Sequence, residues 1–359
     1  MHVVVTGGCG FVGSALARRL VEWLPAIRVT AFDNLRRAGA ETNRSLLRSL
    51  GIAVVHGDAR CRSDVDALPA CDWLIDAAAE PSVLAGTTAA GGGGTTSRQL
   101  VEHNLWGTVN LLEAAAERRS GFVMLSTSRV YAIEPLARLP LAESGSVFRL
   151  DTASPLPIGV GPAGISEAFA TAGPVSLYGA TKLASEALAI EYAAQARTPL
   201  FINRCGVMAG AGQFGRADQG IFSWWIHAWA ARRPLRYIGF GGRGLQVRDC
   251  LHPDDLARLI MTQLSTTATG PQPLVNVSGG LASATSLAEL SAWCADRFGP
   301  HEVAADPAPR PNDIPWLVLD HGRASQAYAW QPDRDRLTIF EEIAAHAEDH
   351  PDWLDRVAN

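Results

Sequence analysis

Short apolar segments alternate with longer segments of helical spacing along the first 200 residues of the chain. The short segments are rich in aliphatic and β-branched residues, which is typical of buried strands. We expect such strands at residues 3–6, 29–32, 53–55, 73–78, 122–126 and 200–203. Apolar residues recur with helical spacing at 14–24, 100–116 and 178–194, which predicts helices. Strands that alternate with helices predict an α/β fold with a doubly wound parallel sheet.

The alternation weakens after about residue 204, where proline and glycine become frequent. Tryptophans at positions 224, 225 and 229 fall in a segment that we expect to be helical. We predict a first domain of residues 1–203, which a segment of about 246–267 rejoins, and a smaller α/β second domain of residues 204–245 and 268–359. Four consecutive glycines at 91–94 are typical of a surface loop.

Composition and cysteine usage exclude several classes of protein. The 359 residues are 47% hydrophobic and 19% charged, unlike a disordered chain. The net charge of −5 provides no general attraction for nucleic acid. No apolar stretch reaches the roughly 20 residues of a membrane span, and the first residues resemble a strand rather than a secretory leader. The six cysteines form no CxxC pair, so we expect free thiols, no metal site and a cytoplasmic protein.

A glycine-rich segment joins the first predicted strand to the first predicted helix. Its sequence is TGGCGFVG, residues 6–13, and Gly7, Gly10 and Gly13 follow a GxxGxxG spacing. Glycine at these places allows a tight turn, close approach of the backbone to a pyrophosphate, and close packing of helix on strand. The free N–H groups at the start of the helix can bind the anion. The segment therefore predicts a Rossmann-type fold that binds a dinucleotide.

Acidic residues end the second and third predicted strands. Asp33 lies 20 positions after Gly13, where its carboxylate can accept hydrogen bonds from the adenosine ribose hydroxyl groups. It would repel a 2′-phosphate, so we expect NAD rather than NADP. Arg36 and Arg37 argue weakly for a phosphate, or are solvated loop charges. Asp58 can meet the adenine amino group, or is simply a surface residue.

A tyrosine and a lysine begin the long helix predicted at 178–194. Tyr178 and Lys182 are four positions apart and so share one helix face. A phenol titrates near pH ~10, but an adjacent ammonium group and a positively charged nicotinamide both favour the phenolate. Tyr178 can then take a proton from an alcohol while hydride moves to NAD⁺, and Lys182 can hold the nicotinamide ribose.

Hydroxyl groups follow the strand predicted at 122–126. The carboxyl ends of strands line the ligand crevice in doubly wound folds. We expect Thr127 to donate to the reacting oxygen and stabilise the change from alkoxide to ketone. Ser126 and Ser128 face the ligands as well, or serve as caps of the local turn.

These motifs together resemble the extended short-chain dehydrogenase/reductase family of NAD-dependent nucleotide-sugar epimerases and dehydratases. The resemblance rests on TGGCGFVG, Asp33, STSRVY and YGATK, and it covers almost the whole chain. It continues in QVRD (residues 246–249), in NVSGG (276–280) and in RPND (310–313). By this resemblance Arg248 and Arg310 bind the nucleotide diphosphate, and Arg310 and Asp313 contact the phosphate and the nucleotide ribose.

Longer segments resemble one branch of that family, the CDP-paratose (CDP-tyvelose) 2-epimerases. They include DNLRRAGAETN, AAEPSVLAG, SLYGATKLASE, NRCGVMAG, ADQG and GFGGRGLQVRDCLH. The branch implies tightly held NAD and epimerisation at C2 of a CDP-linked hexose or deoxyhexose through a transient keto-sugar. Residues expected at the cofactor are Gly7, Gly10, Phe11, Val12, Gly13, Asp33, Asn34, Asp58, Ala59, Ala77, Ala78, Ala79, Asn104, Ser126, Tyr178, Lys182 and Cys205. Residues expected at the nucleotide sugar are Pro81, Ser82, Thr127, Ser128, Arg129, Gln219, Gln246, Arg248, Arg310 and Asp313.

Two departures from the wider family bear on the reaction. The dehydratase branch has Asp-Glu directly after the active-site threonine, whereas this chain has Ser128 and Arg129. Most of the superfamily has an asparagine that binds the nucleotide sugar where this chain has Val207, which weakens an analogy with 4-epimerases. The alternatives are another nucleotide-sugar enzyme on this scaffold (a 4-epimerase, 4,6-dehydratase or reductase) and a non-catalytic NAD sensor.

The helices predicted at 100–116 and 178–194 are apolar on more than one side. In the family that the chain resembles, such a pair commonly forms a four-helix dimer interface. We therefore expect a homodimer.

Overall fold

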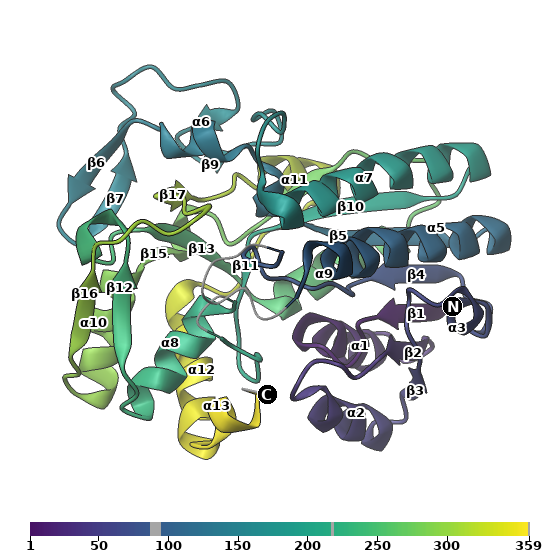
Figure 1. Ribbon diagram of the computed structural model, residues 1–359. Helices are drawn as coiled ribbons and strands as arrows, with labels where there is room; N and C mark the ends of the chain where they lie inside the picture. Colours follow the sequence, from purple (N-terminus) through teal and green to yellow (C-terminus); the bar gives the residue numbers. More distant parts are fainter. Residues whose placement is uncertain (87–94, 217–218, 358–359) are drawn as a thin grey trace.

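The computed structural model describes residues 1–86, 95–216 and 219–357. Its main sheet has seven parallel strands in the order β14-β10-β5-β4-β1-β2-β3 (Figure 1). The strands are β1 (His2–Thr6), β2 (Arg28–Asp33), β3 (Ala53–His56), β4 (Trp73–Asp76), β5 (Gly121–Thr127), β10 (Leu200–Cys205) and β14 (Val275–Val277). Every strand predicted from the apolar segments is present, and the doubly wound parallel α/β fold is confirmed.

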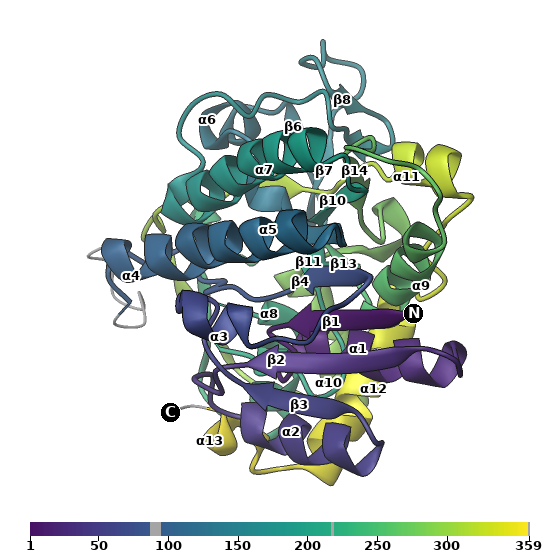
Figure 2. The ribbon, with the colours of Figure 1, turned by 90° about the vertical axis from the view of Figure 1, so that its right-hand side faces the viewer.

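Helices cover both faces of this sheet because its strands are apolar on both sides. Val3 and Val5 of β1 pack in one cluster with α1, α2, α9 and α11, whereas Val4 packs in another with α3, α5 and α7. Successive side chains of a strand point to opposite faces, which explains the two clusters. Figure 2 shows α5 and α7 side by side along their face. The helices are α1 (Phe11–Trp23), α2 (Ala40–Ser49), α3 (Arg62–Asp66), α4 (Ser97–Val101), α5 (Gly107–Arg118), α7 (Ser176–Ala196), α9 (Pro253–Leu264) and α11 (Gly322–Tyr328).

One predicted helix is interrupted. The segment predicted as a helix at 100–116 consists of the end of α4, a π-helical turn at Glu102–Trp106, and α5. The Asn104 carbonyl oxygen in this turn accepts hydrogen bonds from the hydroxyl groups of Thr108 and Ser185, at 2.9 and 3.2 Å. A π turn carries one extra residue, which a pattern of helical spacing does not reveal.

The second part of the molecule lies beside the carboxyl ends of these strands (Figure 1). A four-stranded sheet contains β11 (Val207–Met208), β13 (Val247–Leu251), β15 (Ala284–Ser286) and β17 (Trp316–Leu317), and a two-stranded sheet contains β12 (Leu235–Ile238) and β16 (Val303–Asp306). The helices of this part are α8 (Ile221–Ala230), α10 (Leu287–Phe298), α12 (Arg336–Asp349) and α13 (Trp353–Arg356). The helix expected around the tryptophans is α8, and Trp225 and Trp229 are buried in the core of this part.

The packing departs from the predicted division of the chain in two places. Helix α9 packs against α1, as expected for 246–267, but β13 pairs with β11, β15 and β17, and β14 joins the main sheet instead. An apolar pattern identifies a buried strand without telling which sheet it enters. Residues 130–169 belong by prediction to the first domain, yet several of them share a cluster with Val247 and Trp316. Their elements are α6 (Ile133–Ala137), the hairpin β6 (Leu141–Ser144) with β7 (Val147–Leu150), and the pair β8 (Val160–Gly161) with β9 (Gly164–Ile165).

Three observations bear on membranes, metals and redox chemistry. Among the described residues, no helix combines the length and apolar character that a membrane crossing needs. Across the same residues, no group of three histidine, cysteine or acidic side chains is arranged to bind a metal ion. All six cysteines are free thiols.

Candidate active site

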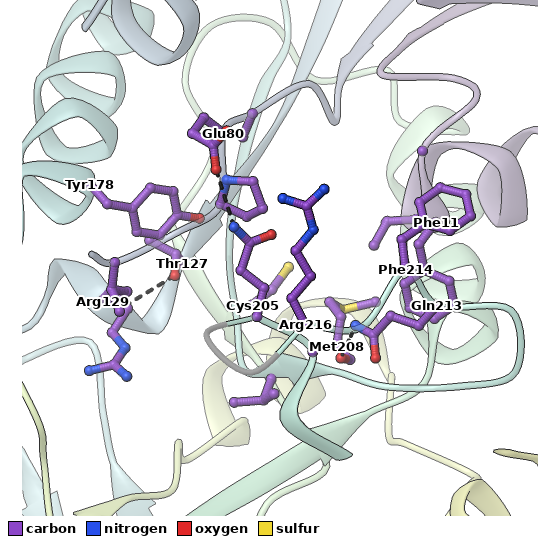
Figure 3. Close-up of a pocket in the computed structure, with 18 of the residues that line it drawn as sticks. Phe11, Glu80, Thr127, Arg129, Tyr178, Cys205, Met208, Gln213, Phe214 and Arg216 are labelled. Atoms are coloured by element: carbon purple, nitrogen blue, oxygen red, sulfur yellow. Dashed lines mark hydrogen bonds between the residues drawn. The ribbon is translucent and has the colours of Figure 1, made fainter. Parts of the chain in front are cut away.

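A cavity of about 880 Å³ opens at the carboxyl ends of β1, β2, β4, β5 and β10. The second part of the molecule forms its other wall, through β12, α8 and residues 310–313. Figure 3 shows side chains from both parts converging on it. The crevice predicted at the strand ends is therefore a single continuous site.

The glycine-rich segment forms one end of this cavity. A Cβ atom on Gly13 would lie 2.1 Å from the Gly7 carbonyl oxygen, and a Cβ on Gly7 would lie 2.8 Å from the Ala77 carbonyl oxygen. Gly7 also has a φ of +60°, in the region that favours glycine. Helix α1 follows directly, and its N-cap residue Gly10 makes no side-chain cap, so the first N–H groups are open toward a ligand. This cradle of bare backbone fits the pyrophosphate of a dinucleotide.

Two aspartates stand beside this cradle, and each already has partners. The Asp33 carboxylate accepts hydrogen bonds from the N–H groups of Cys9 at 2.9 Å and Leu35 at 2.7 Å. Burial nevertheless raises the pKa of Asp33. Asp58 forms a 2.7 Å ion pair with Arg60, which holds the pKa of Asp58 well below its usual range. Asp33 keeps oxygen lone pairs that can accept from a ribose, whereas Asp58 is largely engaged by Arg60.

Tyr178 and Lys182 are both buried on the face of α7 that meets the cavity. Burial raises the pKa of Tyr178 to about 12, although a hydrogen bond with Thr127 and the charge of Arg129 oppose the shift. The Lys182 ammonium group donates a 3.0 Å hydrogen bond to the Leu125 carbonyl oxygen, and burial lowers the pKa of Lys182. Without a bound cofactor, Tyr178 is therefore a protonated phenol that can donate a hydrogen bond.

The three hydroxyl residues at the end of β5 differ in their partners. Thr127 lies beside the Tyr178 ring in Figure 3, and its Oγ1 accepts the Arg129 N–H at 3.2 Å. Ser126 donates a 2.5 Å hydrogen bond to the buried carboxylate of Glu186 on α7. That carboxylate also holds Arg204, at 2.6 and 3.0 Å. Thr127 thus faces the cavity centre, whereas the Ser126 hydroxyl is directed into a buried network behind it.

Three arginines lie near one another on the cavity wall. Arg129, Arg248 and Arg310 line the wall there with one carboxylate, that of Asp313, which lies 3.4 Å from Arg248. Burial and the charges of Arg248 and Arg310 lower the pKa of Arg129 to about 9, although Asp313 opposes the shift. Burial also lowers the pKa of Arg248, whose side chain is only 13% exposed. A site that gathers cations under these conditions is suited to an anionic ligand such as a diphosphate.

Gln246 stands close to this cluster with a fixed orientation. Its amide nitrogen donates to the Ile238 carbonyl oxygen at 2.7 Å, and its buried Oε1 has no hydrogen-bond partner among the described residues.

The cavity unites almost all of the site residues predicted from the sequence. Those that line it are Gly7, Gly10, Phe11, Val12, Gly13, Asp33, Asn34, Asp58, Ala59, Ala77, Ala78, Ala79, Pro81, Ser126, Thr127, Ser128, Arg129, Tyr178, Lys182, Cys205, Gln219, Gln246, Arg248, Arg310 and Asp313. Cys205 is a buried thiol, and burial raises its pKa to about 12. The roles expected for these residues stay predictions.

Two predicted residues do not line the cavity. The Asn104 side chain accepts from the Glu80 N–H at 2.7 Å and donates to the Glu80 carbonyl oxygen at 3.0 Å. Ser82 is buried, and its hydroxyl accepts the Leu84 N–H at 3.2 Å. Both residues shape the segment after β4, so they act on the cavity through that segment rather than as part of its wall. The glycines at 91–94 lie outside the described residues.

Several lining residues were not among those predicted. Glu80 points into the cavity from the segment after β4, and Arg216 points into it from the opposite wall (Figure 3). Arg37 and Phe214 complete the side that faces α1 and α2. The rule that strand ends line the crevice could have found Glu80, because it follows Ala79 directly. No local pattern marks Arg216 or Phe214.

Comparisons with known proteins agree with this geometry. Residues 3–278 match the sequence model of the NAD dependent epimerase/dehydratase family. The chain is 29% identical over 337 residues to the CDP-paratose 2-epimerase of Salmonella typhi, across 92% of this chain and 95% of the relative. It is 28% identical over 343 residues to a dTDP-glucose 4,6-dehydratase of Streptomyces antibioticus, across 93% and 89%.

A solved structure supports the fold. The UDP-glucose 4-epimerase of Thermus thermophilus in complex with NAD superposes with a TM-score of 0.74 over 97% of this chain and 99% of that chain, at 23% identity. The family match extends over more than half of the chain, from the glycine-rich segment through the Tyr178–Lys182 pair to β14. The chain therefore belongs to the NAD dependent epimerase/dehydratase family and is an NAD-dependent enzyme.

Proposed function

We propose that the protein epimerises C2 of a hexose or deoxyhexose linked to a nucleoside diphosphate, with CDP as the favoured nucleotide. The observation that carries this proposal is that Tyr178 and Thr127 line the same cavity as the glycine cradle and the arginine cluster, with Arg129 beside them (Figure 3). A dinucleotide at one end and a diphosphate at the other leave the sugar beside the phenol. The likeness to the Salmonella typhi CDP-paratose 2-epimerase supports the choice of carbon and base.

NAD fits the cradle that the glycines form. Gly7, Gly10 and Gly13 would hold its pyrophosphate, Asp33 its adenosine ribose and Lys182 its nicotinamide ribose. When bound, NAD supplies a hydride acceptor and donor together with a positive charge near the reacting carbon.

Tyr178 would act as the base and acid of the reaction. Its pKa of about 12 without ligand is too high for a base at neutral pH, so the bound cofactor has to lower it. Thr127, which lies beside the Tyr178 ring, would donate to the sugar oxygen as that oxygen changes from hydroxyl to ketone. At the end Tyr178 would return the proton and the hydride would return to C2, so there is no net oxidation.

The arginine cluster would leave the keto-sugar intermediate free to rotate. Arg248 and Arg310 would hold the diphosphate rather than the sugar ring. The 2-keto sugar can then rotate about its link to the diphosphate and present its other face. Ser128 and Arg129 follow Thr127 directly, so this place offers no carboxylic acid for the elimination that a 4,6-dehydratase performs.

Proton NMR of the reaction in D₂O tests the proposal. We expect purified holoenzyme, incubated with CDP-linked hexoses and deoxyhexoses, to invert C2 without incorporating deuterium and without accumulating free NADH. Inversion at C4, a 4-keto-6-deoxy product, or a stable keto product with stoichiometric NADH would contradict it. UDP- and dTDP-linked sugars in parallel reactions test the preference for CDP.

Tyr178→Phe separates an enzyme from an NAD sensor. The substitution removes only the phenol oxygen from a buried ring. We expect the variant to retain NAD and lose turnover by about two to four orders of magnitude. Unchanged activity would remove Tyr178 from the mechanism.

We also propose that the protein is a homodimer. Trp106, the last residue of the π turn, is 55% exposed, and Val101, just before that turn, is 42% exposed. Leu177 and Leu188 of α7 are 42% and 36% exposed. Helices α5 and α7 pack side by side, so these apolar residues belong to one helical layer (Figure 2). A second copy of that layer would cover them.

A further inference from the structure

We propose that Arg37, Gln219 and Glu80 form a bridge over the dinucleotide groove and that this bridge retains the bound cofactor. Opening it would be required before the cofactor can leave. The proposal rests on the NAD dependence of the family and not on the sugar carbon that reacts.

The segment between β11 and α8 crosses from the second part of the molecule to the first. Gly210 lies against Phe11, because a Cβ on Gly210 would be 3.3 Å from the Phe11 ring. Phe214 lies against Gly39, where a Cβ would be 2.7 Å from the Phe214 ring. The described residues of this segment therefore contact the first residue of α1 and the loop after β2.

Hydrogen bonds fasten the segment on both sides of the groove. The Arg37 guanidinium donates to Gln219 Oε1 at 2.9 Å and to the Phe214 carbonyl oxygen at 2.7 Å. Gln219 Nε2 donates to Glu80 Oε1 at 3.2 Å, a contact that Figure 3 marks. One amide side chain thus uses its oxygen toward Arg37 and its nitrogen toward Glu80.

The strand order places this bridge above the glycine cradle. Arg37 follows β2 and Glu80 follows β4, and these two strands flank β1 in the sheet. A connection from the β2 loop to the β4 loop therefore passes over the carboxyl end of β1, where the cradle begins. A dinucleotide lying on that cradle would be enclosed between the sheet edge and the bridge.

Both ends of the bridge are held by further contacts. The Glu80 backbone is fixed by Asn104, whose side chain makes hydrogen bonds of 2.7 and 3.0 Å to it. On the other side, the Trp353 ring of α13 stacks on Phe214, with ring centroids 5.9 Å apart. Trp353 Nε1 also donates to the Gln213 carbonyl oxygen at 2.9 Å. The bridge is therefore part of a built structure rather than a chance contact of surface side chains.

Gln219 lines the cavity, where the resemblance predicts that it contacts the nucleotide sugar. That contact stays a prediction, and in the structure both polar atoms of the Gln219 amide are engaged by Arg37 and Glu80. Retention of the cofactor suits a reaction in which hydride is removed and then returned, because loss of the reduced cofactor would stop the cycle halfway.

The dissociation rate of NADH from holoenzyme tests this proposal independently of turnover. Bound NADH is followed by its fluorescence after excess NAD⁺ is added. We expect Arg37→Ala and Gln219→Ala each to speed release about tenfold, the effect of losing a charge-assisted hydrogen bond. The double variant should release NADH no faster than the faster single variant, because both substitutions open the same bridge. Arg44→Ala is the matched control, since Arg44 on α2 pairs only with the exposed Glu41 among the contacts described.

A pair of compensating substitutions distinguishes loss of the bridge from poor folding of a variant. Gln219→Glu places a carboxylate against Glu80 and should speed release. Adding Glu80→Gln restores a donor opposite that carboxylate and should slow release back to within about threefold of the natural chain.

Three results would overturn the proposal: unchanged release in both alanine variants, multiplicative effects in the double variant, and no rescue by the compensating substitutions. Multiplicative effects would mean that Arg37 contacts the cofactor directly. Release is measured whether or not the chain acts at C2, so failure of the sugar chemistry and failure of the bridge remain distinct.

Discussion

The positive charge of Arg129 acts on the Tyr178 phenol and opposes the rise in its pKa. Burial is the larger effect and raises the pKa of Tyr178 to about 12. The expected partner, Lys182, instead donates to the Leu125 carbonyl oxygen. Arg129 reaches the site because it follows Thr127 at the end of β5, and its own pKa is lowered to about 9 by burial and by Arg248. The charge of Arg129 therefore favours the ionised form of the Tyr178 phenol.

Arg129→Met should shift the pH dependence of turnover to higher pH. The substitution removes a charge that favours the phenolate, so the pKa of Tyr178 rises and less of the base form exists at neutral pH. We expect log kcat to rise with pH and its upper inflection to move up by on the order of one pH unit. Arg243→Met, at an exposed arginine that pairs with Glu143, is the control. A profile that coincides with that of the natural chain would show that Arg129 acts only on binding.

Arg248→Met should weaken binding without weakening the fold. Arg248 is largely buried, and its one described carboxylate partner, Asp313, lies at 3.4 Å. Removal of a buried cation that is only partly compensated costs the apo protein little, whereas a bound diphosphate loses a charge-assisted hydrogen bond. We expect calorimetry with CDP to give a Kd at least about tenfold weaker, and thermal unfolding to give an equal or higher Tm. A clearly lower Tm with unchanged Kd would assign Arg248 to stability.

Acid should destabilise the protein through the histidines beneath α13. His346 lies 3.0 Å from His227 Nε2, and its ring centroid is 4.5 Å from that of His350. Burial and these two neighbours lower the pKa of His346 to about 4. Between about pH 6.5 and pH 4 the unfolded chain therefore binds a proton that the folded chain does not, so stability falls as the pH falls through this window.

The variant His346→Gln tests whether His346 causes this loss of stability at low pH. Glutamine keeps a donor toward His227 but does not titrate. We expect the drop in Tm between pH 7.5 and pH 5 to be several degrees smaller in this variant than in the natural chain. Equal drops would place the acid sensitivity elsewhere.

Trp106→Glu should separate the proposed dimer. Light scattering of the natural chain should give twice its 38.2 kDa mass, and the variant should give the single mass. The exposed Trp106 has no role in the described core, so the variant should keep its Tm when the protein is dilute. Leu337→Glu provides the control, because Leu337 is 50% exposed on α12, away from α5 and α7. A single mass for the natural chain would refute the dimer.

Local chemistry explains why much of this molecule could be predicted from its sequence. The strands around Val3 and Val123, the bend at Gly7 and the close approach of Gly13 to Gly7 depend on neighbours in the chain, so the sequence pattern predicts them. Asp33 could be placed because one helix, one turn and one strand fix its distance from the glycines.

Contacts between remote segments explain what could not be predicted. Nothing near Gln219 indicates that it meets Arg37 on one side and Glu80 on the other. The π turn at Asn104 adds one residue to an otherwise ordinary helical pattern. The residue that Asn104 contacts, Glu80, is remote in the sequence, so the local pattern does not predict this turn. The entry of β14 rather than β13 into the main sheet is likewise decided by the packing of distant elements.

The distribution of the six thiols has a practical consequence. Cys61 is exposed, directly after the Arg60 that pairs with Asp58 at the adenosine end of the cavity, whereas Cys9, Cys205, Cys250 and Cys294 are buried with raised pKa values. A maleimide dye at neutral pH should therefore attach to Cys61 first, without any engineering of the chain. The fluorescence of the attached dye should then change when the cofactor binds or dissociates, so that cofactor exchange can be followed in the natural protein.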